Sequence, residues 1–326
     1  MVWLGKDELN PQFGRVDRRR NRPPPSLPSW QLALEKARPH ADNDVKRWHG
    51  ERQRCDWANL PQGCDPSSGG LSVVRAWRKR RQVENLIGPV EWLASMRART
   101  APGSERSKDT ITIVEFCAGS GHVGLAVAAI LSKSPSLAGM ELRVDINEVN
   151  KHKIATIEER LLVAGGDVRG RCQSYTEHLE TYPGHFDVGI ALHGCGAATD
   201  AVLDRCLLAR AAFVLVPCCV GRLAQPKFFP HRPRSKKFGA VLSSSEMRSL
   251  SRSGDCTVRC PTKLSSDDHL RRDCKKVVDA DRLALAEEAG YITSSFTMSP
   301  FGCTPKNDVL LGWPKEWEDE SHAIQN

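Results

Sequence analysis

The sequence predicts an α/β protein in which one mostly parallel sheet carries helices on both of its faces. Three observations predict this fold. From residue 110 onward, apolar β-branched runs alternate with stretches of helical periodicity. A glycine-rich turn, Gly119 to Gly124, separates the first run from the first helix. Tyr291–Met298 and Asp308–Trp313 are joined by a Pro/Gly turn, which predicts an antiparallel hairpin that closes the sheet.

Five strands precede the hairpin, so the predicted sheet has seven strands. Four of the five are short apolar runs and the third is a weaker pattern: Ile111–Cys117, Leu142–Ile146, Arg171–Ser174, Asp187–Leu192 and Ala212–Pro217. The predicted helices are His122–Leu131, Val149–Val163, Thr199–Leu208 and Asp279–Ala289. Because strands and helices alternate, we expect the strands to run parallel and to be covered on both faces.

The alternating pattern defines a domain over residues 106–315, followed by a tail at 316–326. Within it, residues 221–276 are polar and rich in turn residues, and only a short helix around Ser244–Leu250 is predicted there. We expect this part to be an irregular insertion.

The chain ahead of the domain falls into two parts. Residues 55–105 are expected to form a helical segment and a linker, with Gly88-Pro89 dividing the helix in two. Residues 1–54 are expected to be a basic, Pro-rich, disordered extension, because a run of arginines leads into Pro23-Pro24-Pro25. Only Trp30–Arg38 has helical character in this extension.

Composition limits the class of protein. The chain has 326 residues, of which 40% are hydrophobic and 26% are charged, as in a globular protein with a full core. No apolar run approaches the ~20 residues that cross a bilayer, so we expect no membrane partner. The twelve cysteines include several in apolar segments, where a free thiol packs as a small hydrophobe. We therefore expect a cytoplasmic protein, with the nucleus as the alternative.

The net charge of +8 is unevenly distributed. Residues 1–105 hold 19 Lys and Arg against 12 Asp and Glu, a balance of +7. One helical face in this region carries Arg75, Arg78, Lys79, Arg80 and Arg81. A basic region beside a nearly neutral domain suits RNA as a partner, with a solvated arm as the alternative.

The glycine-rich turn predicts a cofactor site. Gly119, Gly121 and Gly124 form G-x-G-x-x-G between a strand and a helix, a pattern that alone would suit a dinucleotide. Glu115 precedes it, and a carboxylate would repel a pyrophosphate but attract the ammonium and sulfonium of S-adenosylmethionine. The sequence therefore favours S-adenosylmethionine, with a nicotinamide cofactor or a turn without a ligand as alternatives.

A second acidic position follows the next strand. Asp145 lies near the usual distance from the glycines for a carboxylate that accepts the ribose hydroxyls, and Glu148 competes for this role if the strand is longer. Either acid could instead interact with a helix N-terminus. Gln173 or Ser174 could reach the adenine. The predicted cofactor-binding residues are Glu115, Cys117, Ala118, Gly119, Gly121, His122, Asp145, Glu148, Gln173 and His193.

The candidate catalytic residues follow the fourth and fifth strands. His193 could shape the methionine pocket or act as a general base, or it could be only a hydrogen-bonded turn residue. Cys218 and Cys219 could face the acceptor, or could simply pack the floor of the pocket. The segment Phe228-Phe229-Pro230 is also expected at the acceptor site. No metal site is predicted, because neither the 256–274 nor the 49–64 group of Cys and His shows paired C-x2-C spacing.

Taken together, these motifs resemble a known family. Glu115–Gly124, Phe186–Asp200, Pro217-Cys218-Cys219 and Cys303–Asn307 resemble the methyltransferase-like domain of the glutathione S-transferase C-terminal domain-containing proteins, as does the helix Arg78–Leu86. The resemblance implies a Rossmann-like class I methyltransferase fold that binds S-adenosylmethionine. The sequence leaves no room upstream for a glutathione transferase-like region, so glutathione chemistry is not expected.

An element distantly similar to His193–Asp200 occurs in a group of tRNA methyltransferases, which favours tRNA or rRNA as the substrate. The alternatives are a protein or small-molecule methyltransferase, or a non-catalytic binding module. The last stays open because no Asn/Asp-Pro-Pro-Tyr motif follows the fourth strand.

Overall fold

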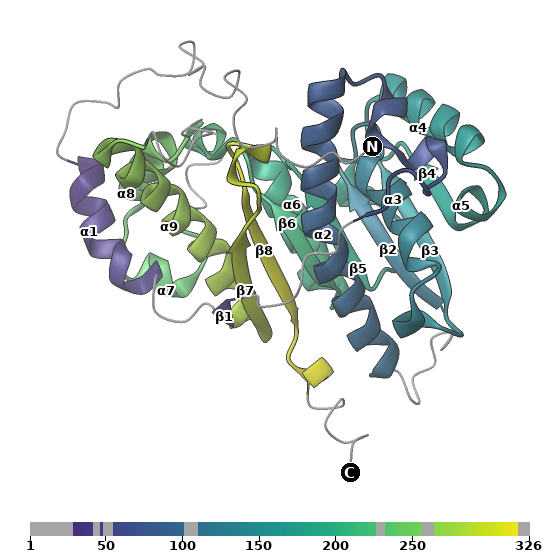
Figure 1. The fold of residues 1–326 in the computed structure, drawn as a ribbon. Coiled ribbons are helices and arrows are strands. Elements are labelled where there is room, and N and C mark those ends of the chain that lie inside the picture. The colour runs from purple at the N-terminus through teal and green to yellow at the C-terminus, as the bar shows by residue number, and fades with distance from the viewer. Residues whose placement is uncertain are drawn as a thin grey trace.

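The computed structural model describes residues 29–41, 46–47, 55–100, 110–225, 232–255 and 264–318. Its centre is one eight-stranded sheet with the order β1-β7-β8-β6-β5-β2-β3-β4 (Figure 1). The strands are β1 Lys46–Arg47, β2 Thr110–Phe116, β3 Glu141–Asn147, β4 Cys172–Tyr175, β5 Val188–Leu192, β6 Ala212–Val216, β7 Tyr291–Thr297 and β8 Asp308–Pro314. β8 runs antiparallel to β6 and β7, and the other pairs are parallel. The predicted class I fold, with seven strands and a closing hairpin, is confirmed; β1 is an addition at the edge.

Helices cover both faces of the sheet. The α-helices are α1 Ser29–Ala41, α2 Val73–Arg99, α3 His122–Leu131, α4 Lys151–Ala164, α5 Gly166–Arg171, α6 Ala197–Ala209, α7 Lys236–Gly239, α8 Ser244–Ser253 and α9 Ser266–Glu288. In one hydrophobic core, the helices α2, α3, α4 and α5 pack on one face of the sheet. A second core joins α6 and part of α9 with the other face. In the described part of the chain, no helix combines the length and the apolarity needed to span a bilayer.

Helix α2 is a single helix, so the predicted break at Gly88-Pro89 is wrong. The residues on both sides of Pro89 belong to one apolar stripe that is fully buried, with Val83 and Leu86 before it and Val90 and Leu93 after it. A proline inside a helix costs ~3 kcal/mol. Burying several large side chains on the core contributes more than this, so the helix continues.

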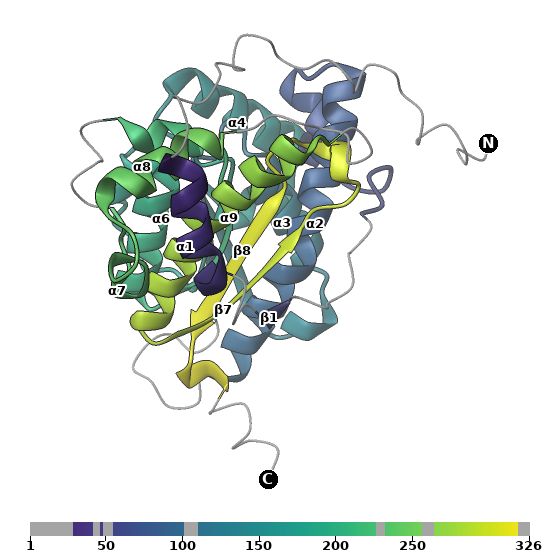
Figure 2. The ribbon, with the colours of Figure 1, turned by 90° about the vertical axis from the view of Figure 1, so that its left-hand side faces the viewer.

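The predicted irregular insertion at 221–276 is also largely helical. It contains α7, α8 and the first half of α9, and these helices form a third core with α1 (Figures 1 and 2). Capping boxes at Ser243–Glu246 and Ser265–Asp268 start α8 and α9. The helix Asp279–Ala289 was predicted, but the first half of α9 was missed because it is mostly polar, although Lys275 in it is buried, as are Asp279 and Arg282.

These buried charges are paired with one another. Arg282 binds Asp200 of α6 at 2.8 Å and Asp279 at 2.7 Å, and Lys275 binds Asp279 at 2.5 Å and Asp308 of β8 at 2.7 Å. Arg232 also pairs with Asp200. The ionic cluster thus ties the helical region to α6 and to the hairpin. Asp200 lies in the first turn of α6 and pairs with Arg232 and Arg282 from other segments.

The expectation of a disordered extension over residues 1–54 is wrong for its described residues. Trp30 and Leu34 of α1 are buried against α8 and α9, as Figure 2 shows for the helices. β1 pairs with β7 in the register Lys46↔Ser294. The Pro-rich run lies outside the described residues. Amphipathic spacing in Trp30–Arg38 was the signal for this helix, but its docking partner could not be predicted.

We predict that Trp30→Ala lowers the free energy of unfolding by about 3 kcal/mol, because it leaves a cavity in the third core. Leu32→Ala is the matched control: Leu32 lies on the same helix but is 54% exposed, so its loss should cost no more than about 0.5 kcal/mol. Urea denaturation followed by circular dichroism measures both. Equal stability of the two variants would show that α1 does not dock.

Candidate active site at the carboxyl edge of the sheet

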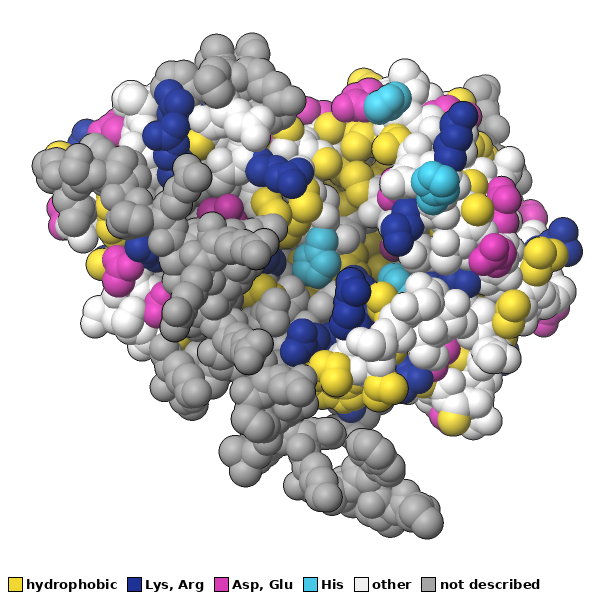
Figure 3. Space-filling model, turned by 90° about the horizontal axis from the view of Figure 1, so that it is seen from above, with side chains coloured by type: hydrophobic (Ala, Val, Ile, Leu, Met, Phe, Trp, Pro, Cys, Tyr) yellow, Lys and Arg dark blue, Asp and Glu magenta, His cyan; other side chains and the backbone are white. Residues whose placement is uncertain are grey.

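The carboxyl ends of the parallel strands β2 to β6 meet at one end of the molecule, where ligands bind in open α/β sheets. Figure 3 looks down on this end. It shows a hollow lined with hydrophobic side chains, with histidine, lysine and arginine side chains around it. The predicted residues that follow β2, β3, β5 and β6 are brought together at this edge.

The glycine turn has the geometry of a cofactor cradle. Gly119 and Gly121 have φ of +59° and +67°, which favours glycine. A Cβ on Gly119 would meet nothing within 4 Å, so the space over this backbone is open to a ligand. A Cβ on Gly124 would lie 2.9 Å from Ile146, so this glycine allows α3 to pack closely on the sheet. Cys117 and Ala118 form the first step of the turn, and Ala118 N donates to Asn147 O at 3.1 Å.

Glu115 lies beneath the glycine turn, where the sequence predicted a negative charge that attracts the cofactor. Its side chain is 2% exposed, and its carboxylate accepts hydrogen bonds from Gly124 N at 2.7 Å and Val123 N at 3.3 Å. Burial raises the pKa of Glu115 to about 7, although the two backbone donors and the nearby Lys79 and Arg160 act to lower it. The carboxylate therefore holds the first turn of α3 and supplies a buried charge that titrates near neutral pH.

The two candidate ribose ligands have different surroundings. Glu148 follows directly after β3 and accepts from Gly119 N at 2.7 Å and from Asn150 N at 2.9 Å, so it connects the second strand end to the glycine turn. Asp145 lies within β3, is fully buried, and binds Arg143 and the Tyr182 hydroxyl. The expectation that Asp145 could hold the ribose is corrected, because its side chain is fully buried inside the strand, whereas Glu148 is only half-buried and lies at the strand end. The strand is longer than predicted, which favours Glu148.

Two other predicted cofactor ligands also point elsewhere. Gln173 pairs with Asp145 in mid-strand, and its Oε1 accepts from Arg143 at 3.3 Å, so it does not lie at the end of β4. His122 has a buried ring whose Nδ1 is 3.0 Å from Arg160 Nη1. Since a guanidinium only donates, this Nδ1 accepts and the ring is neutral. Burial, with Arg160 next, lowers the pKa of His122 to about 2. Only the backbone of His122 remains at the turn.

Arg160 of α4 is a residue that the sequence analysis missed. It is 2% exposed and donates to Ser120 O in the glycine turn, as well as to Gly63 O at 3.0 Å and Asp65 O at 3.1 Å. It therefore joins the turn to the 3-10 helix η2 (Gln62–Cys64). The only signal in the sequence was a basic residue at a core position of an amphipathic helix.

His193 follows β5 and has a φ of +68°, a strained conformation of the kind found at functional sites. Its Nε2 is 3.2 Å from Gln82 Oε1, and Gln82 Nε2 donates to Cys303 O at 2.9 Å. This orientation of the amide makes Nε2 the donor and leaves Nδ1 as the acceptor. Burial, with Lys79 next, lowers the pKa of His193 to about 3, so the ring is neutral and only weakly basic.

Helix α2 supplies two further residues that were not predicted as site residues. Gln82 positions His193, as described above. Lys79 is half-buried; desolvation lowers its pKa to about 8, against the opposing effect of Glu115. The signal for Gln82 was a polar side chain on the apolar stripe of the helix. Lys79 was assigned to a basic outer face, and no pattern in the sequence placed it beside Glu115.

The candidate cysteines form a thiol cluster with a third residue. Cys218 is 6% exposed and its Sγ lies 3.0 Å from that of Cys195 and 3.5 Å from His193 O. Cys219 is half-buried, with its Sγ 3.7 Å from Cys195 Sγ. The hydrogen bond with Cys218 lowers the pKa of Cys195, but Cys219 and burial outweigh it, so the pKa of Cys195 is raised. The neighbouring thiols, Cys195 and Cys219, and then burial raise the pKa of Cys218 strongly. Cys195 and Cys218 are therefore protonated and are poor nucleophiles as they stand. Phe228-Phe229-Pro230 lies outside the described residues.

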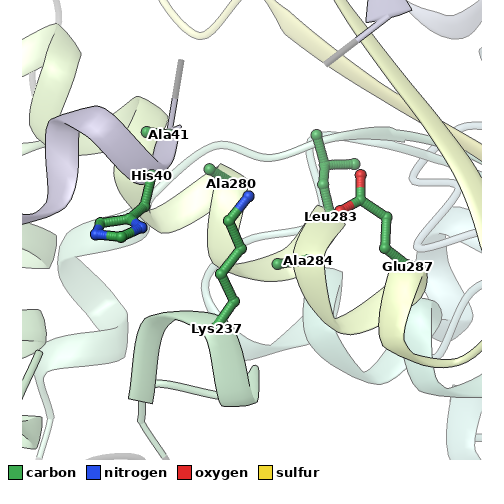
Figure 4. Close-up of a pocket in the computed structure, with 7 residues that line it drawn as sticks. All are labelled: His40, Ala41, Lys237, Ala280, Leu283, Ala284 and Glu287. Atoms are coloured by element: carbon green, nitrogen blue, oxygen red, sulfur yellow. The ribbon is translucent and has the colours of Figure 1, made fainter. Parts of the chain in front are cut away.

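A small pocket elsewhere is not part of this site. It lies among α1, α7 and α9, where His40, Lys237 and Glu287 surround it (Figure 4). None of the residues predicted for the cofactor lines it, so it adds nothing to the site at the carboxyl edge.

Comparisons with known proteins find a methyltransferase domain in this chain. Residues 78–226 match the family described as "Methyltransferase domain". The glutathione S-transferase C-terminal domain-containing protein of Xenopus laevis is 35% identical over 260 residues, which cover 79% of this chain and 38% of the relative. Its homologue in Drosophila melanogaster is 32% identical over 307 residues, covering 91% of this chain and 48% of the relative. The chain thus spans less than half of either relative.

Among solved structures, an SAH-bound methyltransferase of Podospora anserina is 15% identical, with a TM-score of 0.41, and covers 89% of this chain and 99% of that one.

Substitution should distinguish the roles of Asp145, within β3, and Glu148, at its end. We predict that Glu148→Ala weakens binding of S-adenosylhomocysteine about tenfold or more, because a ribose ligand is lost. Asp145→Ala should change this affinity less than about twofold, but should destabilise the fold by about 1–3 kcal/mol, because Tyr182 and Arg143 lose their acceptor. Calorimetric titration and thermal unfolding measure the two effects. The reverse pattern would return Asp145 to the cofactor site.

Glu115 should make cofactor binding depend on pH. Because the positive charges of S-adenosylmethionine favour the carboxylate, its affinity should rise as the pH rises through about 7, the pKa of Glu115. Glu115→Gln should bind about tenfold more weakly at high pH and lose most of this dependence. Glu141→Gln, at the far end of β3, is the control. Unchanged binding and an unchanged pH profile in a cooperatively folded Glu115→Gln variant would refute this role.

Proposed function

We propose that this chain transfers a methyl group to RNA, because residues 78–226 match a methyltransferase domain and the chain is similar to part of the glutathione S-transferase C-terminal domain-containing proteins. The cofactor of the domain is S-adenosylmethionine, which supplies a methyl group already activated by the sulfonium. The proposal has two parts: how the domain holds this cofactor, and which acceptor it meets.

The residues at the carboxyl edge fit the cofactor. The observation that carries this part is the pair of carboxylates around the glycine turn, Glu115 beneath it and Glu148 across from it. Glu148 would accept the ribose hydroxyls, and the open backbone at Gly119 would lie against the methionine part. Glu115 would balance the positive charge from below. A nicotinamide dinucleotide would bring phosphates toward two carboxylates, which disfavours it.

Because the methyl group is already activated, the residues of this chain have to align the acceptor with it and accommodate the proton that the acceptor loses. His193 is neutral, and its free acceptor is Nδ1, since Nε2 donates to Gln82. A base with a pKa of about 3 takes up a proton poorly at neutral pH. We therefore assign His193 to hydrogen bonding with the acceptor, and alignment of the acceptor with the methyl group as the main contribution to rate.

The RNA part of the proposal rests on exposed basic side chains around the edge of the site. Arg75 at the start of α2, Lys151 and Lys153 at the start of α4, and Arg222 in η6 (Val220–Ala224) are exposed. They come from three separate elements that surround the strand ends, where phosphates of a bound RNA would pass.

Part of the predicted basic face of α2 is occupied within the chain. Arg80 binds Asp65 at 2.5 Å and lies over the ring of Trp57. Arg81 binds Glu84 at 2.9 Å and lies over the ring of Trp77. Lys79 is half-buried and interacts electrostatically with Glu115. Of the five basic residues in this face, Arg75 is the exposed one, so the proposed RNA surface moves from the helix face to the rim of the site.

We predict that purified RNA accepts label from methyl-labelled S-adenosylmethionine, while protein and metabolite fractions do not. The double variant Arg75→Glu with Arg222→Glu should bind RNA more weakly and show a shallower dependence on salt, because two phosphate contacts are lost. Its affinity for the cofactor should stay the same.

Lys315→Glu is the matched control, since Lys315 is exposed but follows β8 at the opposite end of the molecule. If the protein or metabolite fraction were labelled and RNA were not, the acceptor would be a protein or a small molecule and the RNA proposal would be wrong. Cofactor binding without turnover on any fraction would favour a non-catalytic binding module.

A further inference from the structure

Three thiols from two separate loops meet at the carboxyl edge of the sheet. Cys195 lies in the turn after β5, and Cys218 and Cys219 follow β6. The two strands are parallel neighbours that end in register at Leu192↔Val216, so the loops that follow them start side by side. The Sγ atoms of the three cysteines lie within 4.8 Å of one another.

The cluster has one buried side and one open side. Cys218 is buried, Cys219 is half-buried and Cys195 is exposed. The backbone holds the loops in place: His193 N donates to Val216 O at 3.1 Å, and Thr199 Oγ1 donates to Gly194 O. The thiols therefore converge through a fixed loop geometry, and the exposed side leaves access for an ion.

We propose that Cys195, Cys218 and Cys219 bind one Zn²⁺ ion through three thiolates. A zinc–sulfur bond of ~2.3 Å in tetrahedral geometry places sulfur atoms ~3.8 Å apart. The Sγ atom of Cys195 lies 3.0 Å from that of Cys218 and 3.7 Å from that of Cys219. All three Sγ atoms lie within 4.8 Å of one another, so each separation is within about 1 Å of the zinc geometry. Small rotations of the cysteine side chains are enough to reach the zinc geometry.

The charge balance is also suitable. Binding replaces three thiol protons, which pass to solvent, and gives an ion with three thiolates and a net charge of −1. Arg222 lies close by: its Cβ would be 2.9 Å from a Cβ on Gly196, the residue next to Cys195. The guanidinium can offset the remaining negative charge.

Three protein ligands leave the fourth position of the ion open, as in zinc sites that bind water or a substrate atom. This position would lie at the carboxyl edge, beside the strand ends that hold His193 and the glycine turn. The site therefore goes beyond the proposed methyl transfer, and it binds its ion whether or not RNA is the acceptor. It also differs from the sequence prediction of no metal, which considered only cysteines close together in the chain.

The test uses the full chain, reduced and freed of metal with a chelator. Titration with Co²⁺ should give thiolate-to-metal charge-transfer absorption that saturates at one ion per chain, and Zn²⁺ should displace it. Elemental analysis should find one Zn²⁺ per chain after dialysis. Cys195→Ser should weaken Zn²⁺ binding roughly tenfold or more, with thermal unfolding of the metal-free protein unchanged because Cys195 is exposed.

Cys55→Ser and Cys172→Ser are the matched controls, since both are free, half-buried thiols away from the cluster, and they should retain the ion. Absence of the charge-transfer band, or full retention of zinc by Cys195→Ser, would overturn the proposal. So would a disulfide between Cys195 and either neighbour in freshly purified protein, located by mass spectrometry of its unreduced peptides.

Discussion

The site depends on the hydrogen bonds by which two carboxylates fix one glycine turn. Glu115 accepts hydrogen bonds from the backbone at the start of α3, and Glu148, after the next strand, accepts one from Gly119 N. Cys117, Gly119 and Gly121 of this turn all have positive φ, a backbone conformation that needs support from the surrounding structure. Because both acids sit at strand ends, the sheet itself sets the shape of the turn. The position of the cofactor is therefore decided by the packing of the whole core.

A second constraint links the site to the helical region. The ionic cluster around Arg282 and Asp200 fills the junction between α9, α6 and β8, and each charge in it has a partner. Removing one member of a buried pair costs more than the pair contributes, because an unpaired charge remains. The buried charges must therefore stay paired, which ties α9 to α6 and to β8. Arg282 Nη2 also donates to Gly196 O at 3.4 Å, so the cluster contacts the loop that carries His193 and Cys195.

Much of the fold could be predicted, because apolar runs and glycine turns report local structure directly. The seven main strands and the glycine turn were found in this way. The errors have one physical source, which is contact between distant segments. The charges of α9 are buried because Asp200 and Asp308 meet them, and α2 continues through Pro89 because the core covers both halves. Choosing between Asp145 and Glu148 required the exact end of β3. The three thiols adjoin only because β5 and β6 are neighbours.

The bonds of Arg160 have a consequence for inherited variation. This side chain reaches from α4 to the carbonyl oxygens of Gly63 and Ser120, so a short stretch ahead of α2 shares in the geometry of the glycine turn. Gly63 has no room for change: a Cβ there would stand 2.0 Å from the main-chain oxygen of Arg160. A missense allele at codon 63, outside the matched domain, should therefore mimic a lesion of the catalytic centre rather than a neutral polymorphism.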